Sequence, residues 1–180
     1  MGRHIAIVVD WFGPFGFEEA RAIARADFAD GLYMLIGKVK YQRANAKLQY
    51  IGVAKGLYQR LSRQHHAVPR LTRDLKIWLG EVASMGIPGR KQKVVHSQLD
   101  LAEWAHSYFL ELPLNERRTV NPPSSPVTVL NRWWQRDYET PRKNRPHRDW
   151  PDLIEFTGMG YGAKVAWLGG RLERWGPEDL

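Results

Sequence analysis

Short hydrophobic runs alternate along the chain with stretches in which apolar residues recur at helical spacing. The runs are rich in β-branched and aromatic residues and end at glycine, proline or polar positions, which is typical of strands. We therefore expect strands at residues 5–9, 31–37, 48–53 and 75–82, and a C-terminal hairpin made by residues 152–156 and 163–168. A polar linker joins residues 31–37 to 48–53, which predicts an antiparallel pair.

Helices are expected where apolar residues fall on one face of a 3.6-residue period. This spacing occurs at residues 18–28, at about 57–66 and at 101–112, where Leu101, Ala105 and Phe109 share a face. The proline-rich stretch 121–126 and the basic region that follows it to residue 148 are expected to be loop.

These elements predict an α/β fold with a small central three-stranded sheet flanked by helices, an added N-terminal strand and helix, and an added C-terminal β-hairpin. The added strands either extend the sheet or form a second, smaller one. We expect an N-terminal extension at residues 1–29, a central domain at 30–116, and a basic, aromatic-rich C-terminal extension at 117–180 that packs on the same domain.

Composition narrows the classes of protein to consider. Of 180 residues, 43% are hydrophobic and eight are tryptophan, which is enough for a core and excludes global disorder. There is no cysteine, so disulfides, thiolate metal sites and cysteine nucleophiles are excluded. The formal charge of +8 points to polyanionic partners. We see no bilayer-spanning run and no secretory signal, and we expect a cytoplasmic protein without a membrane partner.

Five short features occur in a fixed order and together carry a resemblance. They are Gly31-Leu32-Tyr33, Tyr50-Ile51-Gly52, Arg60, Glu103 on the helix expected at 101–112, and Asn115 beyond that helix. In this order and spacing the chain resembles the GIY-YIG nuclease domain from about residue 30 to residue 115. A single tripeptide of this kind would occur by chance in many strands, whereas the ordered set is specific.

The resemblance implies a metal-dependent endonuclease that hydrolyses phosphodiester bonds without a covalent intermediate. Glu103 would be the protein ligand of Mg²⁺, for which Mn²⁺ can substitute, and Arg60 would clamp the scissile phosphate. Tyr33 and Tyr50 would project into the site, where one of them touches the attacking water. Asn115 would hold Glu103 in place from the end of its helix.

Each of these residues also has a structural reading. Asp100 and Glu103 have the spacing of a capping box, in which Asp100 is the N-cap. Arg60 could be a solvent-facing helix residue, and Tyr33 and Tyr50 could be core residues with satisfied hydroxyl groups. Asn115 follows a proline and could simply form a turn.

The chain departs from the family pattern after Arg60. Many family members carry a histidine or tyrosine four residues after this arginine, but here that residue is Gln64, and His65 comes one residue later. Five residues along a helix rotate a side chain by about 140°, so His65 would point away from Arg60 unless the helix ends early. His66 becomes a candidate on the same condition. Gln64 could orient a water but could not take its proton.

We expect the partner to be nucleic acid, most of all double-stranded DNA, because the resembling nucleases act mainly on DNA. Cations beside aromatic residues suit phosphate contact and base stacking; a solvated surface over buried tryptophans is the alternative. A catalytically inactive nucleic-acid-binding protein and a structural domain are the rival functions, and the oligomeric state is left open. The residues expected to bind nucleic acid are Lys55, Arg63, Arg132, Arg136, Arg142, Lys143 and Arg145.

Overall fold

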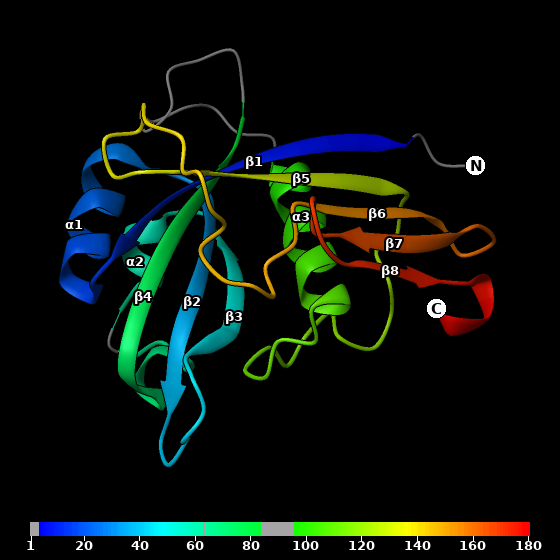
Figure 1. Ribbon diagram of the computed structural model, residues 1–180. Coiled ribbons are helices and arrows are strands. Elements are labelled where there is room, and N and C mark those ends of the chain that lie inside the picture. Colours follow the sequence, from blue (N-terminus) through cyan, green and yellow to red (C-terminus); the bar gives the residue numbers. More distant parts are fainter. Residues whose placement is uncertain (1–3, 63, 84–95) are drawn as a thin grey trace.

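The computed structural model describes residues 4–62, 64–83 and 96–180. In this part of the chain, eight strands form one mixed sheet in the order β3-β2-β4-β1-β5-β6-β7-β8. Neighbouring strands are antiparallel except for β1 and β5, which are parallel. The sheet curls around the long helix α3 (Figure 1).

The elements have the following bounds. The strands are β1 (Ile5–Phe15), β2 (Gly31–Val39), β3 (Lys47–Ala54), β4 (Leu71–Val82), β5 (Val127–Trp134), β6 (Leu153–Gly158), β7 (Gly162–Ala166) and β8 (Leu172–Trp175). The α-helices in the described residues are α1 (Phe17–Asp27), α2 (Leu57–Arg60) and α3 (His96–Phe109). Short 3₁₀ turns lie at Val68–Arg70 and Pro177–Asp179.

The prediction of a small three-stranded sheet flanked by helices is wrong. The three middle strands do pair antiparallel in the order β3-β2-β4, but β1 and β5 continue the same sheet into β6, β7 and β8. The regions predicted at residues 1–29, 30–116 and 117–180 therefore all contribute strands to one sheet, which makes up most of the fold. The predicted C-terminal hairpin is confirmed as β6 and β7, which pair antiparallel.

Strand β5 lies where a loop was predicted. Val127, Val129, Asn131 and Trp133 are buried, whereas the residues between them are more exposed, so the segment has the alternation of a strand. The alternation is hard to see in the sequence, because one of the buried positions is the polar Asn131 and the charged Arg132 follows it. The strand forms because β1, far earlier in the chain, supplies a parallel partner from Ile5 to Phe12.

Strand β1 is longer than predicted. Its pairing with β4 continues past residue 9 to the Phe15–Ile77 pair, across an irregularity between Phe12 and Phe15. Gly13 and Pro14, residue types that usually end a strand, lie within this irregular part of it. Pairing with β4 before and after these two residues keeps them within the strand.

Two hydrophobic cores lie on opposite faces of the sheet. On the concave face, Leu101, Ala105 and Phe109 of α3 belong to a core that includes Trp11 and Trp78. On the other face, the core includes residues of α1 and α2 together with Phe12, Tyr33 and Tyr50 from the strands. The two predicted tyrosines therefore share the face covered by α1 and α2.

Helix α1 confirms the prediction at residues 18–28, and α3 confirms that a helix carries Glu103. Helix α3 begins earlier than expected, so Asp100 lies inside it and is not its N-cap. The capping-box reading of Asp100 and Glu103 is wrong for this reason. None of the helices that the structure describes combines the length and apolar character that a bilayer span requires.

Candidate active site

Tyr33 and Tyr50 come from neighbouring strands whose register brings them together. Tyr33 of β2 lies opposite Gly52 of β3, and Leu35 lies opposite Tyr50. The two tyrosine rings have centroids 5.7 Å apart. A Cβ atom on Gly52 would overlap the ring and hydroxyl group of Tyr33. Glycine at position 52 therefore leaves the space in which Tyr33 lies across β3.

Arg60 is the last residue of α2, a helix of four residues. The turn that starts this helix is formed by Gly56, which has φ +85° and donates its backbone N–H to the Asp30 carboxylate at 3.1 Å. From the end of α2, the Arg60 side chain donates from Nε to the Tyr33 hydroxyl oxygen at 3.1 Å. Arg60 is thus held against the two tyrosines.

The predicted helix at about 57–66 is wrong in its length, because α2 ends at Arg60. The chain then turns back, and the His65 backbone N–H donates to the Ser62 carbonyl at 3.0 Å. His65 is consequently buried beside Tyr33 and does not point away from Arg60. The condition under which His65 and His66 could join the site is therefore met.

His65 is a neutral hydrogen-bond bridge. The backbone N–H groups of Ala67 and Val68 donate to its Nδ1 at 3.0 and 3.4 Å, which places the ring proton of the neutral form on Nε2. Nε2 in turn donates to the Tyr33 hydroxyl oxygen at 2.6 Å. Burial, with smaller effects from the nearby Arg60 and His66, lowers the pKa of His65 to about 4. The imidazole positions Tyr33 and stays uncharged near neutral pH.

The Tyr33 oxygen therefore accepts two hydrogen bonds, one from Arg60 and one from His65. Burial, followed by the influence of Tyr50, raises the pKa of the Tyr33 hydroxyl, so this group keeps its proton near neutral pH. Tyr50 also interacts with the Arg60 guanidinium. Tyr33 supports the site from behind, while Tyr50 faces the adjoining pocket.

Gln64 lies away from the pocket beside Tyr50, whereas His66 lines it. Gln64 is exposed and is not among the residues that line the pocket beside Tyr50. His66 does line this pocket, stacks on His65 with centroids 4.7 Å apart, and meets the Tyr50 ring edge-on at 5.0 Å. The imidazole available at the pocket surface therefore belongs to His66.

Glu103 projects from α3 and is buried. Ser107, one turn later, donates its hydroxyl proton to Glu103 Oε1 at 3.3 Å, and Arg118 donates from Nη1 to Oε2. Burial raises the pKa of the Glu103 carboxyl, although Arg118 and Ser107 act in the opposite direction. This carboxylate sits in an environment that favours a nearby positive charge.

Asn115 joins strand β3 to helix α3. Its Oδ1 accepts a hydrogen bond from the Ile51 backbone N–H at 2.9 Å, and its Nδ2 donates to the Ile51 carbonyl at 2.9 Å. Nδ2 also donates to Ser107 Oγ at 3.0 Å, and Ser107 contacts Glu103. The geometry fits the supporting role expected for Asn115, since one amide ties Glu103 to the strand that carries Tyr50.

A pocket of about 470 Å³ brings the expected residues to one surface. Tyr33 and His65 lie behind it through their hydrogen bonds to Arg60 and to each other. Three arginines and two glutamates line the pocket, so it is strongly polar. Its lining residues are Tyr50, Val53, Arg60, His66, Glu103, Asn115, Glu116, Arg117 and Arg118.

The donor set is compatible with a hard divalent cation. Glu103 supplies carboxylate oxygens at the pocket surface, and Mg²⁺ is commonly held by one or two carboxylates together with water and substrate phosphate oxygens. Among the described residues there is no group of three or more histidine, aspartate or glutamate side chains that would form a complete metal cage. The protein can therefore supply part of a coordination shell here.

Several residues expected to bind nucleic acid form ion pairs within the chain. Arg132 donates to both oxygens of Asp10 at 2.7 and 2.8 Å, while Arg136 contacts Glu19 and Arg145 contacts Asp152. Lys55 is exposed, and Arg63 lies outside the described residues. The basic cluster, meaning the seven residues expected to bind nucleic acid, is therefore less available to phosphate groups than its positive charge suggested.

Arg142 and Lys143 are exposed and make no ion pair with other residues that the structure describes. The Arg142 guanidinium lies 5.2 Å from the centroid of the Trp78 ring. Both side chains line a pocket of about 620 Å³ that also includes Trp134. They are the members of the basic cluster best placed to meet an external anion.

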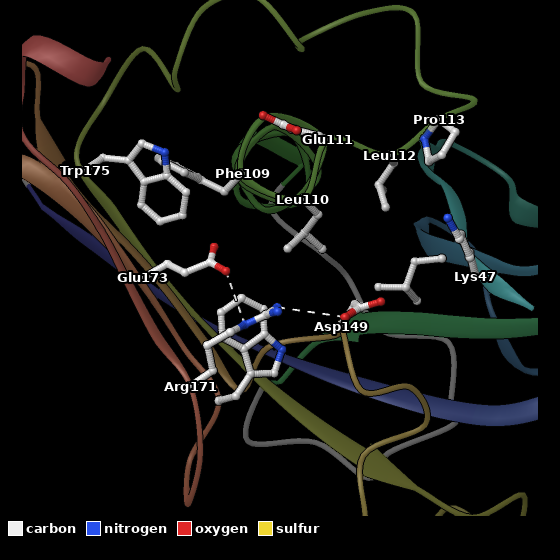
Figure 2. Close-up of a pocket in the computed structure, with 12 residues that line it drawn as sticks. Lys47, Phe109, Leu110, Glu111, Leu112, Pro113, Asp149, Arg171, Glu173 and Trp175 are labelled. Carbon is white, nitrogen blue, oxygen red and sulfur yellow. Dashed lines mark ion pairs between the residues drawn. The ribbon is translucent and has the colours of Figure 1, made fainter. Parts of the chain in front are cut away.

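A further pocket of about 370 Å³ lies between the end of α3 and the β7–β8 region. Figure 2 shows Arg171 lying toward Glu173 on one side and Asp149 on the other, with nitrogen–oxygen distances of 3.2 and 3.9 Å. Phe109 and Trp175 contribute apolar walls. None of the residues expected to act in catalysis lines this pocket, so it is separate from the candidate active site.

Sequence reasoning missed Ser107 and Arg118, which both donate hydrogen bonds to the Glu103 carboxylate. Ser107 lies four residues after Glu103, a spacing that puts two side chains on one helix face and could have signalled the contact. Arg118 follows Asn115 in an irregular segment, and no periodic pattern marks it. Comparison of the chain with protein-family models, curated proteins and solved structures gives no match.

Proposed function

We propose that the protein is a metal-dependent endonuclease that hydrolyses phosphodiester bonds in DNA. The observation that carries this proposal is the meeting of Tyr50, Arg60 and Glu103 at one pocket, with Tyr33 hydrogen-bonded behind it. These side chains come from β2, β3, α2 and α3, and ordinary core packing does not require them to gather at a polar surface. The resemblance to GIY-YIG nucleases gives each of them a role in the same reaction.

Arg60 would bind the scissile phosphate. Its guanidinium uses Nε to reach Tyr33 and also interacts with Tyr50, and its remaining N–H donors can bond to phosphate oxygens. Such donors stabilise the charge that accumulates on the phosphorus oxygens in the transition state. Because Tyr33 fixes the guanidinium before substrate arrives, little reorganisation is needed when the charge develops.

Tyr50 and His66 would handle the attacking water. Both line the pocket, and their rings contact each other edge-on. A neutral imidazole accepts a proton near neutral pH far more readily than a phenol does, so His66 is the better proton acceptor. Tyr50 would orient the water, and Tyr33 with His65 would keep Tyr50 and Arg60 in position.

Glu103 would hold Mg²⁺, with Mn²⁺ as a substitute, and Asn115 and Ser107 would fix its carboxylate. A bound divalent ion supplies Lewis acidity at phosphate oxygens and neutralises the departing oxygen. Arg117 and Arg118 line the same pocket and add positive charge where a nucleic-acid backbone would enter.

Supercoiled plasmid incubated with purified protein tests the proposal. We expect nicked or linear product with Mg²⁺ or Mn²⁺ and none with EDTA, while an RNA transcript of the same sequence should be cleaved more slowly. Salt-sensitive binding of plasmid without cleavage under both metals would contradict the enzymatic proposal and favour a nucleic-acid-binding protein that has lost catalysis.

A further inference from the structure

Arg118 makes an unusually complete set of contacts with the first half of α3. Its Nη1 donates to Glu103 Oε2 and, at 3.0 Å, to the Asp100 carbonyl oxygen, while Nη2 lies 3.4 Å from Asp100 Oδ1. The guanidinium also lies 5.4 Å from the centroid of the Trp104 ring. Arg118 is therefore bound to α3 through two carboxylates, a carbonyl group and an aromatic face.

The backbone at Arg118 supports this placement. Its φ is +60°, in the left-handed region that residues other than glycine and asparagine rarely adopt. The segment from Asn115 to Arg118 thus leaves β3, to which Asn115 is bonded, and turns so that the arginine returns to α3. The contacts of Arg118 with α3 maintain a backbone conformation that is unfavourable by itself.

The Arg118 guanidinium is hydrogen-bonded to the Glu103 carboxylate, the group that a metal ion would need as its ligand. Ser107 contacts one oxygen of Glu103 at 3.3 Å, and Arg118 takes the other at a shorter distance. A buried, ionised carboxylate without a positive partner is strongly unfavourable, so the charged form of Glu103 requires a cation beside it. Arg118 meets this need within the chain, whereas Arg117, its neighbour at the pocket, makes no ion pair with the residues that the structure describes.

We infer that Arg118 is the internal counter-ion of Glu103 and competes with the divalent cation for it. This inference rests on the proposed function, because it assumes that Glu103 is the metal ligand. When a divalent ion binds Glu103, the Arg118 guanidinium is displaced into the pocket, where it can contact a phosphate group. Phosphate binding and metal binding then strengthen each other, since each favours the released position of Arg118.

Direct Mn²⁺ binding tests the competition without any activity measurement. Free Mn²⁺ is quantified by electron paramagnetic resonance during titration of wild type, Arg118→Gln and Arg117→Gln. We expect Arg118→Gln to bind Mn²⁺ about tenfold more tightly than wild type, because the competing charge is gone. Arg117→Gln removes the same charge from the same pocket without touching Glu103, and its affinity should change less than about threefold.

Two further readouts protect the test against misfolding and nonspecific effects. Thermal unfolding should show a lower midpoint for metal-free Arg118→Gln and a larger rise on Mn²⁺ addition than wild type shows. A short DNA duplex should tighten Mn²⁺ binding in wild type and do so less in Arg118→Gln. If Arg118→Gln does not give a folded protein, Arg118→Lys is used, which should bind Mn²⁺ more tightly than wild type by a smaller factor.

The outcomes separate the inference from the function on which it rests. Unchanged or weaker Mn²⁺ binding by a folded Arg118 variant, while Glu103→Gln abolishes binding, would overturn the competition and leave the metal role of Glu103 intact. Mn²⁺ binding by Glu103→Gln equal to that of wild type would overturn both.

Discussion

The hydroxyl oxygen of Tyr33 connects two polar side chains that lie close together in the sequence. Arg60 reaches it from the end of α2 at 3.1 Å, and His65 reaches it from the turn that follows at 2.6 Å. Among the described residues, this oxygen is the acceptor that the structure gives for both Arg60 Nε and His65 Nε2. At the scale of single residues, Tyr33 is the point at which the arrangement is most sensitive.

Tyr33→Phe should therefore reduce both stability and activity. Removing one acceptor leaves two donors unsatisfied, which lowers the free energy of unfolding by about 1–3 kcal/mol. Plasmid cleavage should fall at least about tenfold, because Arg60 loses its anchor. Urea denaturation and initial cleavage rates measure the two effects. Tyr58→Phe is the control, because its hydroxyl group makes no hydrogen bond with the residues that the structure describes. Equal losses in both variants would contradict this role of Tyr33.

Two buried histidines predict how stability depends on pH. Burial lowers the pKa values of His65 and His106 to about 4, whereas an imidazole in the unfolded chain titrates near 6.5. Between these pH values the unfolded chain binds more protons, so the free energy of unfolding falls as pH falls from about 6.5 to about 4. The raised pKa of Glu103 acts in the opposite direction but involves one group.

Urea denaturation across this pH range measures the effect. The fully buried His106 alone should contribute on the order of 2 kcal/mol of lost stability at the acidic end. His65→Asn should flatten the dependence, whereas the same change at the exposed His4 should leave it as in wild type. A stability that is constant, or that increases as pH falls through this window, would be inconsistent with these pKa shifts.

At the scale of elements, strand register decides which side chains meet. The pairing of β2 with β3 sets Tyr33 opposite Gly52, and the glycine leaves room for the tyrosine ring. Glycine at position 31 is constrained in the same way, since a Cβ there would lie 2.7 Å from the Gly80 carbonyl oxygen and 2.8 Å from Leu57. The glycines of both motifs thus allow close packing around the tyrosines.

Gly52→Ala should disable the site while leaving most of the fold in place. The added methyl group would displace the Tyr33 ring and break its hydrogen bonds to Arg60 and His65, and overpacking of this kind typically lowers the free energy of unfolding by about 1–3 kcal/mol. Cleavage and thermal unfolding report the change. Gly160→Ala, where a Cβ meets open space, should behave as wild type. Wild-type cleavage by Gly52→Ala would show that the position of Tyr33 does not matter.

Local patterns in the sequence predicted more of the site than of the sheet. Strands β2, β3 and β4 and helices α1 and α3 have clear periodicity, and these strands and α3 carry Tyr33, Tyr50 and Glu103. The end of α2 could not be read from apolar spacing, because it depends on the His65 side chain accepting backbone N–H groups. The eight-stranded sheet depends on the parallel pairing of β1 with β5, which no local pattern encodes.

At the scale of the whole molecule, net charge overstates the surface available to nucleic acid. The chain carries +8, but Arg132, Arg136 and Arg145 are partly neutralised by Asp10, Glu19 and Asp152. These pairs join strands and loops that are distant in sequence, so part of the positive charge stabilises the fold. Arg142 and Lys143 remain as exposed cations beside Trp134.

The double variant Arg142→Glu with Lys143→Glu should weaken binding to duplex DNA by about tenfold or more and make it less sensitive to salt. Loss of phosphate contacts, and the counterions that they release, accounts for both effects. Fluorescence anisotropy at several salt concentrations measures them. Arg174→Glu reverses an exposed charge on β8 and should change binding far less. Equal weakening by both changes would indicate that only net charge matters.

The most direct test of the proposed catalysis compares two glutamates in one pocket. Glu103 and Glu116 both line it, but of the two only Glu103 is buried, and its carboxylate accepts hydrogen bonds from Ser107 and Arg118. Plasmid cleavage with Mg²⁺ should be lost in Glu103→Gln and retained within about threefold in Glu116→Gln. Each substitution removes the same charge from the same pocket, so a difference between the two variants reports the role of Glu103 and not the change in charge. Metal-dependent cleavage by Glu103→Gln at the wild-type rate would contradict the proposal that Glu103 holds the catalytic metal.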